Sequence, residues 1–192
     1  MERPHAEGRF AARSTPLRGE IRLSPVPEPF QYRPELVDAT AFVAPNATVV
    51  GDVVIEAESS AWYGAVIRGD TERIRIGRAT NIQDLAVLHA DPGFPCLLGN
   101  RVTVGHGAVV HGAVVEDDVM IGMRAVVMNG AHIGRGSIVG VGAVVTEETQ
   151  IPPGSIVLGL PAKVVRQVTE RDRERIAHAA QHYVESARQF LQ

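Results

Sequence analysis

A six-residue repeat running through the middle of the chain constrains the fold more than any other feature. Aliphatic or small residues recur at every sixth position, except for two places with extra residues and one place, after Val110, with a residue fewer. The nineteen rungs of this ladder are Val43, Val49, Ile55, Ala61, Ile67, Ile76, Ile82, Leu88, Leu98, Val104, Val110, Val115, Ile121, Val127, Ile133, Val139, Val145, Ile151 and Val157. A single period over so long a stretch predicts one continuous repeat structure.

Each hexad is long enough for one short strand and one turn, and three hexads make one coil of triangular cross-section. We therefore predict an all-β solenoid, a parallel β-helix over about residues 42–160, with the rungs stacked inside. Small residues such as Ala86 and Ala108 lie four places after a rung and fit an inner corner. Glycines directly after a rung, such as Gly77 and Gly122, suit turns that need a positive φ. The alternative, a β-sandwich of short strands, would not keep one period so long.

The segments on either side of the repeat differ from it in composition. Residues 1–28 are rich in Pro, Arg and Glu and predict a disordered or loosely ordered extension, before a repeat domain at 29–166. Residues 167–192 predict a C-terminal helix that packs on the solenoid, capped by Thr169 with Asp172 three residues later. Its expected apolar stripe is Ile176, Ala179, Ala180, Tyr183, Ala187, Phe190 and Leu191.

Composition excludes several classes of partner. The formal charge of −3 and the scattered arginines argue against nucleic acid. Apolar runs are too short for a membrane span, and the N-terminal stretch resembles neither a signal peptide nor an anchor. The single cysteine, Cys96, makes an internal disulfide unavailable, so the cytoplasm is the expected compartment.

Three histidines fall inside the repeat. With the three faces named a, b and c from Val43 onward, successive rungs of face b are followed by Arg68, His89 and His111. The repeat stacks these residues in one column, with coils about 4.8 Å apart. Two imidazoles at that spacing can reach one ion, since Zn–N bonds are about 2.0–2.1 Å. The dropped residue beside His111 is a break of pattern of the kind found at functional sites.

His106 lies elsewhere, as the third residue of its hexad on face a, below Asp84. One chain is therefore poorly placed to bring it to an ion held by His89 and His111. The spacing favours a metal shared between subunits of a cyclic trimer, although a local corner geometry would allow a single-chain site. Several polar residues crowd the same coils and favour a metal site: Arg68, Asp70, Gln83 and Asp84.

Five stretches carry a resemblance to a known family: WYGAVIRGD (62–70), RIGRATNIQDLAVLH (75–89), VTVGHGAVVHG (102–112), IGMRAVV (121–127) and PPGSIVLGLPAKVVR (152–166). From about residue 42 to 166 the chain resembles the γ-class carbonic anhydrases, a family of hexapeptide-repeat proteins. The conjunction of RGD, NIQD and H-x4-H on this repeat is specific. The resemblance implies a left-handed coil.

The resemblance also implies a site. Three histidines would bind zinc, or iron or cobalt, across the interface of a homotrimer, namely His89, His106 and His111, with His106 supplied by the adjacent subunit. The residues implied around them are Gln83 near the metal-bound water with Asn81 beside it, and Arg68, Asp70 and Asp84 at the interface.

The implied reaction is reversible hydration of CO2 to bicarbonate by a metal-bound hydroxide. Gln83 would orient the reactants, and Arg68 would fix interface carboxylates and steer the product. Two family glutamates that transfer protons are not matched: Thr71 follows the Arg-x-Asp triplet, and the loop after His89 holds only Asp91. A weak or silent metal-binding homologue therefore stays open, as does a hexapeptide acyltransferase using acyl-CoA with one histidine as base.

Overall fold

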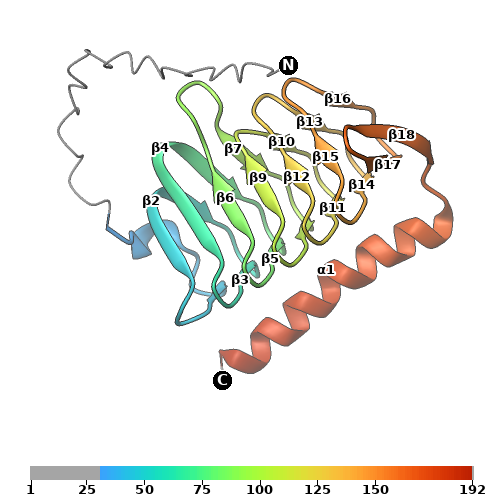
Figure 1. Ribbon diagram of the computed structural model, residues 1–192. Coiled ribbons are helices and arrows are strands. Elements are labelled where there is room, and N and C mark those ends of the chain that lie inside the picture. The colour runs from blue at the N-terminus through green and yellow to red at the C-terminus, as the bar shows by residue number, and fades with distance from the viewer. Residues whose placement is uncertain (1–30, 192) are drawn as a thin grey trace, which may run out of the picture.

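The chain folds into a left-handed parallel β-helix, with a helix, α1 (Glu170–Phe190), lying along one side (Figure 1). This computed structural model describes residues 31–191, so the extension predicted for residues 1–28 lies outside the described residues. A short 3-10 helix (Pro34–Leu36) leads into the first coil. Face a consists of β1 (Phe42–Val43), β3 (Ser60–Ala61), β5 (Asn81–Ile82), β8 (Thr103–Val104), β11 (Met120–Ile121), β14 (Ile138–Val139) and β17 (Ser155–Gly159).

Two long strands, β2 (Thr48–Ile55) and β4 (Val66–Ile76), turn a corner and link face b to face c. The first part of β4 pairs with β6, and its last three residues pair with β7. Face b continues with β6 (Val87–His89), β9 (Val109–His111), β12 (Val126–Val127) and β15 (Val144–Val145). Face c continues with β7 (Cys96–Leu98), β10 (Val114–Val115), β13 (His132–Ile133) and β16 (Gln150–Ile151).

The predicted ladder forms the core of the solenoid. Every rung from Val49 to Val157 is buried, and Val43 is half-buried against the same cluster. In face b, Ile67 pairs with Leu88 and Leu88 with Val110, so the rungs stack as the period predicted. The β-helix prediction is confirmed, and the sandwich alternative is wrong.

Glycine is required directly after the rungs for a different reason from the one predicted. Positive φ occurs instead three residues after a rung, as at Leu85 (60°) and Gly107 (65°). A Cβ on Gly77 would lie 2.5 Å from the carbonyl oxygen of Gly99, and one on Gly122 would lie 2.6 Å from the amide nitrogen of Val141. These glycines allow successive coils to approach closely, because any side chain there would meet the backbone of the next coil.

The solenoid ends in a hairpin that the repeat did not predict. Strand β18 (Ala162–Gln167) pairs antiparallel with β17 and closes face a. The predicted capping box follows: the hydroxyl of Thr169 accepts from the amide of Asp172, whose carboxylate accepts from the amide of Thr169. Arg166 also donates to Asp172 at 2.6 Å, and this hydrogen bond, with those from Thr169, holds the pKa of the Asp172 carboxyl far below its ordinary value.

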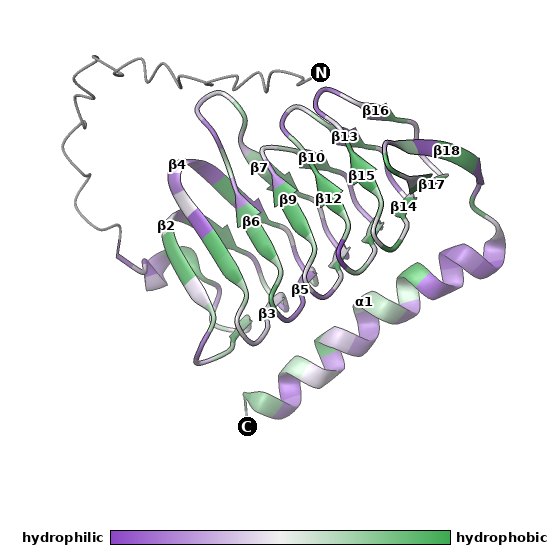
Figure 2. Cartoon of the chain, viewed as in Figure 1, coloured by the Kyte–Doolittle hydropathy of each residue, from purple (hydrophilic) through white to green (hydrophobic). Residues whose placement is uncertain are grey.

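Helix α1 covers part of face a (Figures 1 and 2). Its buried residues are Ile176, Ala180, Val184 and Ala187. Val184 was missing from the predicted stripe, and Phe190 and Leu191 are about half exposed because they lie at the end of the helix. Phe190 still contacts Trp62, with ring centroids 5.5 Å apart. Within residues 31–191, no helix has both the length and the apolar character required to cross a membrane.

We predict that Val127→Asp lowers the free energy of unfolding by about 3 kcal/mol or more, because it places an unpaired carboxylate in the aliphatic column. Val114→Asp is the matched control, since Val114 is an exposed valine on face c. Thermal denaturation measures both variants. A loss of about 3 kcal/mol should lower the melting temperature by several degrees or more. A melting temperature for Val127→Asp within about a degree or two of the parent would contradict the observed register.

Candidate metal centre

The ends of β4, β6 and β9 bring the predicted column together. Arg68 pairs with His89, and His89 with His111, in register across three coils. Nδ1 of His89 lies 2.8 Å from Nε2 of His111, and the ring centroids are 4.9 Å apart. Both imidazoles therefore point toward the same small volume, as the spacing predicted.

Asp70 fixes the orientation of His89. One carboxylate oxygen of Asp70 lies 3.1 Å from Nε2 of His89, and the other accepts a hydrogen bond from Arg68. Burial raises the pKa of the Asp70 carboxyl, but the hydrogen bonds from Arg68 and His89 outweigh it and leave the pKa below its ordinary value. Asp70 is therefore an anion that holds the ring of His89 from the side away from His111.

A side-chain amide fixes His111 in the same way. Oδ1 of Asn129 lies 2.7 Å from Nδ1 of His111, so Nδ1–H donates to Asn129 and Nε2 keeps its lone pair. The amide group of the same Asn129 donates to Asp91 at 2.9 Å. Asn129 thus connects a site histidine to the loop that follows His89.

These contacts assemble a set of donors suited to a divalent cation. Ligand atoms of His89, Asp91 and His111 lie within 4.8 Å of one another, and all three residues are partly or fully buried. Two imidazole nitrogens and a carboxylate oxygen are the donor types that zinc and ferrous iron accept. The residues present therefore fit such an ion.

The dropped residue after Val110 makes room for this arrangement. It places Gly112 at the corner with φ 55°, and a Cβ there would lie 2.2 Å from Oδ1 of Asn129 and 2.9 Å from Cβ of Phe94. The bare corner lets Asn129 reach His111 from the next coil and lets the loop with Phe94 fold over it. The break in the repeat thus lies beside His111 and shapes its surroundings.

His106 belongs to a second group on the edge between faces a and b. Its Nδ1 lies 2.8 Å from a carboxylate oxygen of Asp84, which confirms the predicted stacking of the two residues. Its backbone N–H donates to Oε1 of Gln83 at 3.2 Å, and Nε2 of Gln83 donates to Asn81 at 3.1 Å. Nε2 of His106 lies 3.5 Å from the hydroxyl of Tyr183 on α1. Burial, together with the charge of Asp84, raises the pKa of that Tyr183 hydroxyl.

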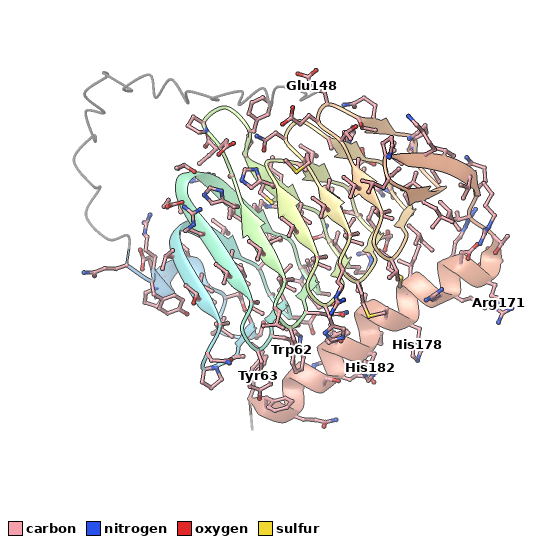
Figure 3. The ribbon with its side chains drawn as sticks, in the orientation of Figure 1. Trp62, Tyr63, Glu148, Arg171, His178 and His182 are labelled. Atoms are coloured by element: carbon pink, nitrogen blue, oxygen red, sulfur yellow. The ribbon has the colours of Figure 1, made fainter. Side chains whose placement is uncertain are left out.

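The predicted site residues therefore form two half-sites. The column half-site comprises Arg68, Asp70, His89 and His111, and the corner half-site comprises Asn81, Gln83, Asp84 and His106. Within residues 31–191 no hydrogen bond or ion pair joins the two, and His106 is not among the clustered ligand atoms. Asp91, Asn129 and Tyr183 were not predicted as site residues. His178 and His182 are exposed on α1 (Figure 3), and no hydrogen bond or ion pair in the described part of the chain joins them to either half-site.

The fold and these clusters define a hexapeptide-repeat β-helix protein with histidines grouped at its corners. Residues 112–147 match the family model described as bacterial transferase hexapeptide (six repeats). A Methanocaldococcus jannaschii protein named "Probable carbonic anhydrase" is 48% identical over 149 residues, which are 78% of this chain and 94% of that protein. Mitochondrial gamma carbonic anhydrase 2 of Arabidopsis thaliana is 42% identical over 79% of this chain and 57% of its own length.

Among solved structures, a hexapeptide transferase family protein from Anaplasma phagocytophilum superposes with a TM-score of 0.78 at 36% identity, over 80% of this chain and 91% of that one. The chain belongs to the γ-class carbonic anhydrase family of hexapeptide-repeat proteins.

We predict that Gly112→Ala disrupts the column half-site. The added Cβ must displace Asn129, so affinity for a divalent ion should fall about tenfold or more. Stability should fall by about 1 kcal/mol from the positive φ, plus a further cost from the clash.

Gly136→Ala is the matched control, because Gly136 has φ 67° and open space where a Cβ would stand. It should share the backbone cost and keep ion affinity. Isothermal titration and thermal denaturation measure the two quantities. Equal ion affinity in the two variants would show that Asn129 does not support the site.

Proposed function

We propose that this protein is a zinc-dependent carbonic anhydrase, with iron or cobalt as alternative metals, that hydrates CO2 reversibly at the subunit interfaces of a homotrimer. The observation that carries the proposal is the division into two half-sites. His89 and His111 converge on one volume, whereas His106 is held, oriented and exposed on a different edge. A threefold rotation that brings the corner half-site of one subunit to the column half-site of the next unites all three histidines.

Each histidine is already prepared for ligation. Asp70 orients His89, Asn129 accepts from Nδ1 of His111, and Asp84 lies against Nδ1 of His106. The last two contacts leave Nε2 of each ring with its lone pair. Nε2 of His111 points toward Nδ1 of His89, and Nε2 of His106 lies 3.5 Å from the hydroxyl of Tyr183. When bound, a divalent ion supplies a Lewis acid that lets water ionise near neutral pH.

Gln83 and Arg68 act on the substrate in this proposal. Gln83 is buried, and one N–H of its side-chain amide donates to Asn81. The other N–H of this amide makes no hydrogen bond within residues 31–191. That donor can position CO2 beside the reacting water. Arg68 is about half exposed beside the column, where its charge can attract the bicarbonate product.

The surfaces around the half-sites suit a second copy of this chain. Outward valines stack in register on face b beside His89 and His111, where Figure 2 shows a hydrophobic stretch of strands: Val66, Val87, Val109, Val126 and Val144. Exposed apolar residues flank His106 on its edge: Tyr63, Leu85, Met123 and Val141. Apolar groups on both surfaces would be buried when copies associate head to tail.

Two further points of the proposal concern setting and rate. The sequence has one cysteine, Cys96, so it has no internal disulfide, which fits a protein of the reducing cytoplasm. Cys96 is buried, and burial raises the pKa of its thiol to about 12. Thr71 stands at one of the unmatched glutamate positions, and its hydroxyl donates to the carbonyl oxygen of Ala90. A proton would therefore leave through water or through another group.

Stopped-flow CO2 hydration tests the activity directly, with zinc-loaded protein and with protein loaded with iron under anaerobic conditions. We expect hydration above the buffer rate that is lost in His111→Ala, because one of the two converging imidazoles is gone. His178→Ala, on the exposed side of α1, is the control and should keep full activity. Ion binding without hydration in either form would favour a silent homologue, and acyl transfer from acyl-CoA without ion binding would favour the acyltransferase alternative.

Complementation tests the shared site. His89→Ala and His106→Ala should each lose activity and most of their ion affinity. Mixed and reassembled after mild dissociation, they should recover in part, because some interfaces then pair an intact column half-site with an intact corner half-site. Stopped-flow CO2 hydration measures the recovery, and native mass spectrometry verifies that mixed trimers have formed. Confirmed mixed trimers without recovery would refute the shared site.

A further inference from the structure

We propose that Asp91 is a third metal ligand from the same chain as His89 and His111, so that a single subunit holds a divalent ion before a neighbour contributes His106. This inference rests on the proposed metal centre and adds a ligand to it. Its starting observation is that the ligand atoms of His89, Asp91 and His111 lie within 4.8 Å of one another.

Asp91 is held in place by the same group that fixes His111. Asn129 accepts from Nδ1 of His111 and donates to Oδ2 of Asp91, so a single amide sets the relative position of two donors. Oδ1 of Asp91 makes no hydrogen bond within residues 31–191 and remains available to an ion. The carbonyl oxygen of Asp91 also accepts from the amide of Phe94 at 2.8 Å, which ties down the start of the loop.

The packing of the loop keeps Asp91 at the site. Phe94 lies over two glycine corners: its Cβ is 2.9 Å from a Cβ built on Gly112, and its Cε1 is 3.3 Å from one built on Gly130. Larger residues at either corner would push the loop away. The bare corner at Gly112, where the repeat drops a residue, therefore leaves room both for Asn129 and for the loop that carries Asp91.

The donor set is chemically sufficient on its own. Two histidines and one carboxylate hold zinc in hydrolytic enzymes and ferrous iron in oxygenases, in both cases with coordination positions left open. The negative charge of Asp91 also favours a dication in a partly buried place. His106 of the adjacent subunit would then add a fourth protein ligand, and the reacting water of the proposed function would take a fifth position. An ion held in this way would help to bring the subunits together.

The test removes His106 from every chain, so that no neighbour can supply it, and measures the Co²⁺ binding that remains. His106→Ala should still bind about one Co²⁺ per chain, more weakly than the parent, with a visible absorption spectrum typical of nitrogen and oxygen ligands. His106→Ala/Asp91→Asn should then lose about tenfold or more of that affinity. Asn at 91 can still accept from the amide of Asn129, so the loop contact is retained while the anionic ligand is removed.

His106→Ala/Glu72→Gln is the matched control. Glu72 accepts from the amide of Gly93 in the same loop at 3.3 Å, yet it is not among the clustered donors. This double variant should have the same Co²⁺ affinity and the same absorption spectrum as His106→Ala. Competition with a chromophoric chelator measures the affinities, and thermal denaturation without metal verifies that all variants are folded.

The outcomes separate this inference from the proposed function. Equal Co²⁺ affinity in His106→Ala and His106→Ala/Asp91→Asn, or no binding by His106→Ala when the parent binds, would overturn the role of Asp91 and leave carbonic anhydrase activity standing. Binding that depends on Asp91, in a parent that does not hydrate CO2, would support the ligand and overturn the activity. A parent that binds no Co²⁺ would overturn the metal centre and Asp91 together.

Discussion

The hydrogen bonding of each coil to the next is the interaction on which the rest of this structure depends. Parallel backbone pairs link every coil to its neighbours, and the aliphatic rungs fill the space that the coils enclose. A side chain at one corner is therefore held at a constant separation from its counterpart one coil away. His89 and His111 approach to 2.8 Å because they occupy equivalent positions in consecutive coils, and no special loop is needed to bring them together.

The same regularity explains which parts of the molecule the sequence could predict. Any residue inside a hexad can be assigned a face and a column by counting, so the stacks Arg68–His89–His111 and Asp84–His106 followed from the sequence. Their geometry agrees with that count. The start of the helix at Thr169 was equally predictable, because a capping box depends only on residues three positions apart in the sequence.

Residues outside the repeat could not be placed by counting. Asp91 lies on a loop between hexads, and Tyr183 depends on how far α1 is rotated and shifted along face a. Asn129 was within reach of a closer reading: it follows Val127 by two, as Gly112 follows Val110, so a polar side chain lies one coil below a bare corner beside His111. The positions of the glycines after the rungs were evident from the sequence, but the reason given for them, a positive φ, was wrong. A sequence pattern shows positions and does not show contacts between coils.

The position of the two half-sites on different sides of the solenoid has a consequence for assembly. If the centre is shared as proposed, each chain carries one acceptor surface and one donor surface, and their union is head to tail. An open dimer would leave one unmatched surface of each kind, whereas a closed ring leaves neither. In such a ring the number of complete centres equals the number of chains, so the number of three-histidine centres per chain reports ring closure without any measurement of size.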